Sequence, residues 1–282
     1  CNGVDNTHRV IRRPDAPSLI VLDKATGRVV AQDGEHIGPR IFHSTWSSPS
    51  LGEVNGRRLV FFGGGDGVCY AFTALNPLEP SETCQTLERV WHFDCDPAAP
   101  KENIHSYQGN LQESPSNIKG MPVFYNNRIY VTAGGDIWQG KKKACLKCID
   151  ATQTGDVTES AELWSYPLEL HACATPAIAD GLLFVTDCRG LVHCIDAETG
   201  APCWTHKLRR DIWGSTLVAD GKVYVGSQGR DFFIFAASKD KEVLFATEFE
   251  APINSTPVAA NGVLYVATLR NLYAIAETPR TE

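Results

Sequence analysis

Arginine, histidine and tryptophan side chains recur at two kinds of position in this 282-residue sequence. The first is a short polar turn, which carries Asp66, Arg189, Arg230 and Arg270 at equivalent points of a repeated pattern. The second is the segment just ahead of a predicted strand, which carries His43, Trp46, His171, Asp211 and Trp213. A guanidinium fork suits carboxylate or phosphate groups, and an indole suits flat or sugar-like molecules. These residue types indicate a site for a small anionic or sugar-like ligand, or for a protein partner.

The positions can be compared because the chain repeats itself. The stretch HACATPAIADGLLFVTDCRGLVHCIDAETGAPCWTH, residues 171–206, has related copies at 213–247 and 253–276. The turn glycines Gly181, Gly221 and Gly262 lie 40 and then 41 residues apart. A fixed period in this range is typical of repeat architectures.

Each copy has the same order of local signals. A Ser/Thr-Pro start leads to an apolar strand, and an Asp/Asn-Gly pair then predicts a tight hairpin turn. A strand such as KVYV follows, then a polar turn, a third strand, an Asp-x-x-Thr-Gly turn and a last strand with Trp or Phe. Four antiparallel strands in about 40 residues are the content of a propeller blade. The sequence therefore predicts an all-β fold, a β-propeller of four-stranded antiparallel blades.

Four whole blades and two partial ones can be traced along a single predicted domain, residues 1–282. The boundaries fall near 1–34 (partial), 46–96, 120–170, 171–210, 211–252 and 253–277 (partial). Insertions at 73–87 and 94–120, rich in Pro, Ser and Asn, are predicted to be irregular loops. Both partial blades contain a third strand, so they cannot complete each other. We expect a missing N-terminal segment or a partner chain to close the ring, with about seven or eight blades in the intact protein.

The topology of a meander assigns the polar residues to one face. The turn between the second and third strands lies on the same side as the start of the first strand. The side chains introduced above are therefore predicted to form a ring near the central channel. The alternative is that the turn arginines are merely solvated and the tryptophans pack the channel mouth. The opposite face holds the Asn-Gly and Asp-x-x-Thr-Gly turns and is predicted to be structural.

The repeat resembles the pyrroloquinoline-quinone (PQQ)-like β-propeller repeat. The resemblance is carried by GLLFVTDCRGLVHCIDAETGAPCW (181–204), NGVLYVATLRNLYAIA (261–276) and SLIVLDKATGRVV (18–30), and by a looser copy at 127–164. In style the chain is most similar to members from planctomycete-type bacteria. The resemblance implies that Trp91, Trp164 and Trp204, with Phe245 standing in, are the residues that dock one blade on the next.

Two kinds of protein share this repeat. One comprises quinoprotein dehydrogenases, which oxidise alcohols or sugars with PQQ and calcium. The other comprises non-enzymatic propellers, including the scaffold lipoprotein of the outer-membrane β-barrel assembly machinery. Dehydrogenases of this family resemble one another in an adjacent Cys-Cys pair, which this chain lacks, and its single Cys-x-x-Cys, Cys145 to Cys148, is not followed by His. A calcium site cannot be assembled from matching motif positions either.

The resemblance therefore favours a non-catalytic ligand-binding or scaffold propeller of the bacterial envelope, periplasmic or secreted, without cofactor, metal or catalytic residues. The alternative is a PQQ-dependent oxidoreductase acting on an alcohol or sugar. A third possibility is a hydrolase or lyase that uses His43 or His171 as acid or base, although no supporting triad is visible.

Composition excludes other classes. A net charge of −7 argues against nucleic-acid binding, and no apolar run reaches the ~18 residues of a membrane span. Of the ten cysteines, Cys148 and Cys194 occupy a repeat position that Ala71 and Ala274 fill in other blades. They are therefore predicted to be small buried residues rather than metal ligands. Cys188 and Cys203 could pair with neighbours in an oxidising compartment.

Overall fold

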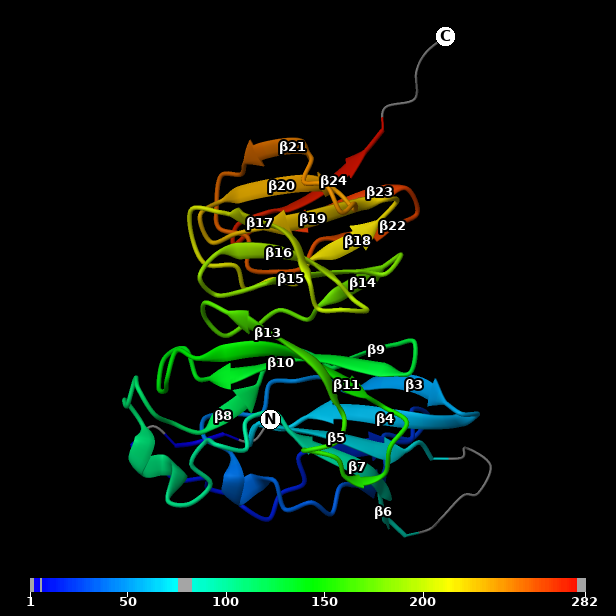
Figure 1. Cartoon of the computed structure of the whole chain (residues 1–282), viewed down its shortest axis with the longest axis vertical. Helices are drawn as coiled ribbons and strands as arrows, with labels where there is room; N and C mark the ends of the chain where they lie inside the picture. The colour runs from blue at the N-terminus through cyan, green and yellow to red at the C-terminus, as the bar shows by residue number, and fades with distance from the viewer. Residues whose placement is uncertain (1–2, 6, 76–82, 278–282) are drawn as a thin grey trace. The chain divides into compact units, whose positions relative to one another are not determined.

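The computed structural model describes residues 3–5, 7–75 and 83–277 of the chain (Figure 1). In this part of the chain the regular structure is β-strand, apart from two short 3-10 helices, Gly38–Arg40 and Ile104–Tyr107. The chain divides into two compact units, residues 1–171 and 172–282. The division coincides with the predicted border between the third and fourth blades. That all 282 residues form a single domain stays a prediction.

The first unit contains three sheets, in chain order. The partial N-terminal sheet pairs β1 (Ile20–Leu22) with β2 (Val29–Gln32). The next is the antiparallel meander β3 (Ser50–Val54), β4 (Arg57–Gly63), β5 (Val68–Thr73) and β7 (Arg89–Asp94). The third is built from β9 (Val123–Tyr125), β10 (Arg128–Gly135), β11 (Ala144–Asp150) and β13 (Glu162–Leu168).

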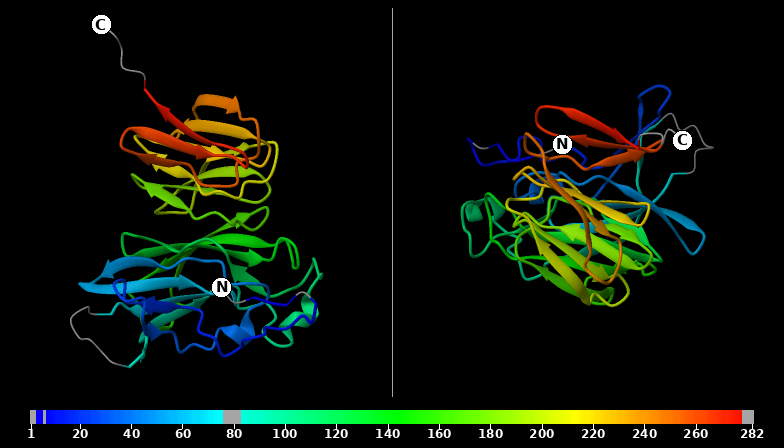
Figure 2. Two further views of the ribbon diagram at one scale, coloured as in Figure 1. Left: turned by 180° about the vertical axis from the view of Figure 1, so that it is seen from behind. Right: turned by 90° about the horizontal axis from the view of Figure 1, so that it is seen from above.

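The second unit contains two four-stranded meanders and a three-stranded sheet. The first consists of β14 (Ala177–Ala179), β15 (Leu182–Thr186), β16 (Leu191–Asp196) and β17 (Pro202–Lys207). The second consists of β18 (Leu217–Ala219), β19 (Lys222–Gly226), β20 (Asp231–Ala236) and β21 (Val243–Glu248). The last consists of β22 (Val258–Ala260), β23 (Val263–Ala267) and β24 (Leu272–Ala276). Within this unit the sheets stack face to face, as two views show (Figure 2). The predicted all-β class, with four-stranded antiparallel blades, is confirmed.

The hairpin turns have the backbone geometry that their sequences predict. Both central residues have positive φ in each turn, for example 49° at Asp180 and 75° at Gly181. Two successive positive φ values define a type I′ turn, whose twist matches that of the flanking strands. The same pattern holds at Asn55-Gly56, Asn126-Asn127, Asp220-Gly221 and Asn261-Gly262.

Three short strands were not predicted, and all involve the long insertions or turns. β6 (Gln85–Thr86) pairs in parallel with β2, and β12 (Gly155–Asp156) pairs in parallel with β7. In both cases a loop from one blade extends the outer edge of the preceding sheet. The third, β8 (Ser116–Ile118), ends the 94–120 insertion and pairs with the far half of β10, while β9 pairs with its near half. The innermost strand of this blade is therefore interrupted between residues 118 and 123.

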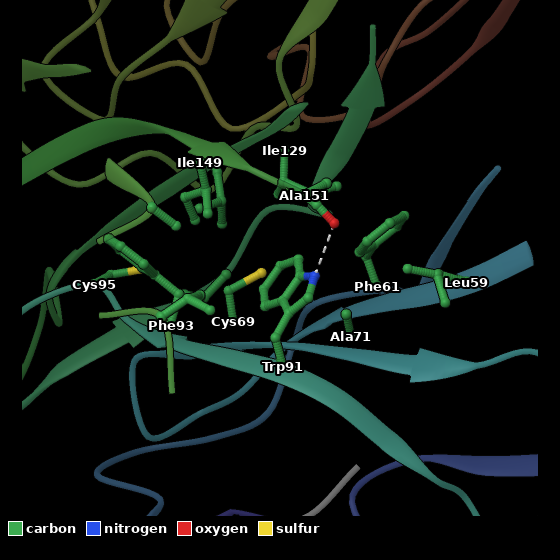
Figure 3. Packing of buried hydrophobic residues seen from close by; sticks show 14 of the residues in the cluster. Leu59, Phe61, Cys69, Ala71, Trp91, Phe93, Cys95, Ile129, Ile149 and Ala151 are labelled. Atoms are coloured by element: carbon green, nitrogen blue, oxygen red, sulfur yellow. Dashed lines mark hydrogen bonds between the residues drawn. The ribbon is translucent and has the colours of Figure 1, made fainter. Parts of the chain in front are cut away.

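Adjacent blades are joined by a buried indole. Trp91, on β7, is fully buried in a cluster that draws on both neighbouring sheets and includes Phe61, Ile129 and Ile149 (Figure 3). Its Nε1 donates a hydrogen bond to the carbonyl oxygen of Ala151 in the following blade, at 3.2 Å. The indole thus supplies both the apolar contact and a polar anchor across the two sheets.

The other residues assigned to docking differ in burial. Trp204 donates from Nε1 to the carbonyl oxygen of Ser238 in the next blade, at 3.0 Å, and its ring packs on Phe235. Trp164 is half-buried and packs on Tyr130 of its own blade. Phe245 is exposed, so the ring that stands in for tryptophan is not covered in this part of the chain.

Substitution of Trp91 tests the docking role. Trp91→Phe removes the hydrogen bond to Ala151 but keeps most of the apolar ring, so we expect the free energy of unfolding to fall by about 1–2 kcal/mol. Trp91→Ala opens a cavity and is expected to cost about 3–5 kcal/mol. Urea denaturation followed by circular dichroism measures both. Leu111→Ala, at an exposed position, is the control and should change stability by less than about 0.5 kcal/mol. Equal stability of Trp91→Phe and the parent chain would contradict the assignment.

Candidate functional site

Seven residues from four segments of the first unit form one aromatic and polar cluster. His43 and Trp46 precede β3, Trp138 and Asp136 belong to the turn after β10, and Asn117, Lys119 and His171 complete the set. We call these residues the indole cluster. The sequence predicted three of them, His43, Trp46 and His171, and the structure brings these three into one network.

Two indoles and an imidazole form the outer part of the cluster. The ring centroids of Trp46 and Trp138 lie 5.2 Å apart in an edge-to-face arrangement, and His43 lies 5.5 Å from Trp46 and 5.9 Å from Trp138. These spacings are those of favourable aromatic pairs. Trp46 is 40% exposed and Trp138 is 43% exposed. Two large apolar rings are therefore held side by side at the surface.

A buried lysine lies beneath the rings. Lys119 is only 5% exposed, and its Nζ is 5.1 Å from the centroid of Trp46 and 5.7 Å from that of Trp138. The ammonium donates to Asp136 Oδ2 at 2.7 Å and to Asn117 Oδ1 at 2.9 Å. Lys119 occupies the interruption between β8 and β9, where the innermost strand turns away from β10. That break in the strand lets its side chain reach the turn that carries Trp138.

Asp136 connects the turn to the rest of the cluster. Its Oδ1 accepts the backbone N–H groups of Trp138 (3.0 Å) and Gln139 (2.9 Å), which fixes the turn. Its Oδ2 accepts from His43 Nδ1 at 2.9 Å as well as from Lys119. Burial alone would raise the pKa of Asp136, but the His43 hydrogen bond and the Lys119 ammonium outweigh it and hold the pKa below its usual range. Asp136 is therefore an ionised acceptor for both partners.

His171 closes the inner side of the cluster. It is fully buried, and its Nε2 lies 3.0 Å from the Asn117 carbonyl oxygen and 3.1 Å from Asn117 Oδ1, so this nitrogen carries the proton and donates. Burial, together with the nearby Lys119 charge, lowers its pKa to about 3. His171 is thus a neutral structural residue and does not contact the surface.

The 94–120 insertion supports the turn of Trp138. The backbone N–H of Gly109 donates to the Gln139 carbonyl oxygen at 2.8 Å, and that of Lys141 donates to Ser114 Oγ at 2.9 Å. The two segments approach closely, since a Cβ atom at Gly140 would lie 2.4 Å from Ser114 Oγ. The insertion therefore braces the turn from outside, while Asp136 fixes it from inside.

Asp66 lies outside the indole cluster, although the sequence assigned it to the same ring. It is buried, and its Oδ2 accepts from Tyr70 Oη at 2.7 Å and from Arg40 Nε at 3.0 Å. Burial raises its pKa, against the opposing charge of Arg40. The three side chains line a cavity of about 930 Å³. Asp66 therefore holds other side chains in place and presents no charge at the surface.

The three arginines of the predicted ring lie in the second unit. Contrary to the prediction, Arg230 does not occupy the same turn position as Arg189 and Arg270. Arg189 lies two residues after Asp187, which caps its turn, and Arg270 lies two residues after Thr268, which caps the corresponding turn. Arg230 comes one position later, at the point of positive φ (72°) that Gly67 and Gly190 occupy in other blades. In the sequence the order Gly229-Arg230 is the reverse of Arg189-Gly190, so matching the two arginines hides the shift. Arg230 forms an ion pair with Glu248, and Trp213 of the same unit is half-buried.

Sequence reasoning missed Asn117, Lys119, Asp136 and Trp138. One available signal was the turn pattern: Asp136-x-Trp138 repeats Asp187-x-Arg189, with the aspartate capping the backbone two residues on. Trp138 thus stands where other blades carry arginine. Lys119 had no such signal, because it belongs to an insertion that has no counterpart in the other blades.

Two cysteines lie at the strand position where the repeat predicts a small core residue. Cys148 and Cys194 are both fully buried on their strands, as predicted for small core residues.

The indole cluster does not supply the oxygen ligands of a calcium site. Over the described residues, no group of three or more His, Cys, Asp or Glu side chains could hold a metal ion. The one carboxylate of the indole cluster, Asp136, is already bonded to Lys119 and His43. Calcium takes six to eight oxygen ligands, and this donor set does not supply them.

Part of the chain is similar in sequence to known proteins. A family model described as outer membrane protein assembly factor BamB matches residues 142–238. Over 123 residues the chain is 28% identical to a quinohemoprotein alcohol dehydrogenase of Comamonas testosteroni, which is 39% of this chain and 17% of that protein.

Two solved structures share the fold. The crystal structure of BamB from Moraxella catarrhalis superposes with a TM-score of 0.58 and 16% identity, over 89% of this chain and 62% of that chain. The computationally designed Ika8 protein superposes with a TM-score of 0.61 and 11% identity, over 93% of this chain and 66% of that chain. The chain thus spans less than two thirds of the length of these relatives. Within the described residues, no helix is long and apolar enough to cross a membrane.

The buried charge pair predicts a strong dependence of stability on both partners. Lys119→Met leaves Asp136 buried without its ammonium, and we expect a loss of about 3 kcal/mol in unfolding free energy. Asp136→Asn should cost a similar amount, and the double variant less than the sum, because neither charge is then left alone. Urea denaturation measures the cycle. Lys222→Met, which breaks an exposed pair with Asp220, is the control and should cost about 0.5 kcal/mol or less. A Lys119→Met loss no larger than this would contradict the buried pair.

The neutral His171 predicts a pH-dependent stability. Its folded pKa of about 3 lies below the unfolded value near 6.5, so the unfolded chain binds more protons between these pH values. Stability should therefore fall as the pH drops from 6.5 towards 3, by up to about 1.4 kcal/mol per pH unit. Denaturation at pH 7.5 and 5.0 should show a smaller difference for His171→Gln, which keeps a donor but cannot titrate. His8→Gln, at an exposed position, should keep the parent slope. Equal slopes in all three proteins would refute the assignment.

Proposed function

The chain belongs to the PQQ-like, BamB-type propeller repeat family, and from this premise we propose that it is a non-catalytic binding propeller whose contact surface is the indole cluster. The observation that carries the proposal is the pair of half-exposed indoles, Trp46 and Trp138, held at 5.2 Å by a buried polar network. The wider family has both enzymatic and non-enzymatic members, so the assignment rests on the site rather than on the fold.

The arrangement supports binding because the rings are fixed before any ligand arrives. Asp136 caps the turn of Trp138, and Ser47 Oγ donates to the Gly120 carbonyl oxygen at 3.0 Å, which anchors the segment of Trp46 beside Lys119. Rings held in this way lose little conformational entropy on binding. Their exposed area is then available for contact rather than needed for packing.

The charges of the cluster favour an uncharged, sugar-like ligand. The single ammonium, on Lys119, is buried and bonded to the ionised Asp136, so the cluster offers no unbalanced positive charge to an anion. Indole rings bury the apolar face of a flat or sugar-like molecule. In the tautomer whose Nδ1–H donates to Asp136, His43 Nε2 is an acceptor, which suits a hydroxyl donor. An extended sugar chain would meet both rings and this nitrogen together.

The bacterial envelope is the proposed location. The family model that matches residues 142–238 is described as an outer membrane protein assembly factor. A periplasmic or secreted propeller would meet the glycans of the envelope, and a protein partner is the competing occupant of the same surface. Arg189, Arg230 and Arg270 belong to a separate hypothesis, in which an anionic ligand binds the second unit.

Glycan binding tests the proposal. Purified chain should bind neutral oligosaccharides on an array of envelope glycans, and titration of a hit should change tryptophan fluorescence. Trp46→Ala and Trp138→Ala are each expected to weaken binding at least about tenfold, or about 1.4 kcal/mol, since each removes one ring of the contact surface. Isothermal titration calorimetry gives the affinities.

Two control variants separate the alternatives. Phe245→Ala removes an exposed ring outside the cluster and should leave the affinity unchanged. The triple variant Arg189→Ala, Arg230→Ala, Arg270→Ala should also leave it unchanged, and a loss of binding there would favour the anionic ligand. Glycan binding that survives in the Trp46→Ala, Trp138→Ala double variant would reject the cluster as the site. If the array gives no hits and the chain instead captures a polypeptide, in a way that depends on both tryptophans, the ligand of the indole cluster is a protein and not a sugar.

A further inference from the structure

Two cysteines of the second unit lie in contact although they belong to different segments. Cys173 lies in the segment ahead of β14, and Cys188 lies in the turn between β15 and β16. Their sulfur atoms are 3.6 Å apart, which is van der Waals contact for two sulfurs. Cys188 is 2% exposed, while Cys173 is half-buried. One thiol of the pair can therefore be reached from solvent, and the other is covered.

Hydrogen bonds hold the backbone on both sides of the contact. Asp187 Oδ1 accepts the backbone N–H groups of Arg189 (2.9 Å) and Leu191 (3.0 Å), and the Gly190 N–H donates to the Asp187 carbonyl oxygen at 3.0 Å. The segment of Cys173 is held at Thr175, whose N–H donates to Ser215 Oγ at 2.9 Å. Both supporting segments are therefore fixed, and they hold the two sulfur atoms in contact.

We infer that Cys173 and Cys188 are an oxidation site of this protein, at which an oxidised thiol reagent such as glutathione disulfide forms an intramolecular disulfide. The thiolate of Cys173, the more accessible sulfur, attacks glutathione disulfide and releases one reduced glutathione. The thiolate of Cys188 then attacks the protein-bound sulfur and releases the second. The two protein thiols lose two electrons and two protons, and one glutathione disulfide becomes two glutathione thiols.

The link would tie the start of the blade to its own second turn. The closed loop spans residues 173–188 and contains β14 and β15 with their hairpin. Closing a loop of this size restricts the unfolded chain, which stabilises the folded blade. A chain exported to an oxidising compartment would carry the bond, and a chain in a reducing compartment would carry two thiols.

Peptide mapping tests the site. The reduced, intact chain is equilibrated with glutathione disulfide, denatured, alkylated and digested with trypsin and an Asp-specific protease. This combination leaves Cys173 alone in peptide 156–179 and Cys188 alone in peptide 187–189. We expect these two peptides to be joined, two hydrogens lighter than their sum, and the melting temperature of the oxidised chain to rise by roughly 5 °C.

Matched variants make each outcome decisive. Cys188→Ser should abolish both the joined peptide and the melting shift, and should leave Cys173 as a mixed disulfide with glutathione. Cys84, which is exposed, reports in every sample that the oxidant has reacted. If Cys84 is fully modified while Cys173 and Cys188 are both still alkylated, the inference is wrong. It is equally wrong if either cysteine is joined to a different peptide.

Discussion

The burial of one indole between two sheets is the contact on which the first unit depends. A four-stranded blade has two faces, and it cannot cover both with its own side chains. Trp91 fills the space between two such blades. Its hydrogen bond to the Ala151 carbonyl oxygen fixes the position of one sheet relative to the other. Trp204 makes the equivalent contact in the second unit. With the sheets fixed, the turns that project from them are also fixed in space.

The indole cluster is built from such turns. A side chain that begins the turn after the second strand accepts backbone N–H groups, whether it is Asp136, Asp187, Ser227 or Thr268. The Asp136 carboxylate makes a second set of hydrogen bonds, because its other oxygen accepts from Lys119 and His43. A residue that caps the same turn in three other blades therefore also lies at the centre of the indole cluster in this blade.

The periodic part of the protein could be predicted from the sequence, and the aperiodic part could not. Type I′ turns, strand order and the burial of Cys148 and Cys194 follow from local signals that recur in each copy. Lys119 depends on the break between β8 and β9, which occurs in one blade only. Its partner is 17 residues away in sequence, across a strand, and no repeat position points to it. For Asp66 the repeat position itself misled the prediction. It suggested an exposed charge, but Arg40 and Tyr70 bind the carboxylate and bury it.

The buried ammonium also limits which ligands the two exposed rings can accept. Lys119 lies 5.1 Å and 5.7 Å from the ring centroids, so the negative face of each indole already interacts with one cation. A second cation on these rings would compete with Lys119 for the same negative ring faces. An anion gains little, because Asp136 lies 2.7 Å from the same ammonium and offsets its field. The electrostatics therefore favour neither charged class, and this is why the ligand that we propose for these rings is neutral, with apolar faces for the indoles and a hydroxyl group for His43.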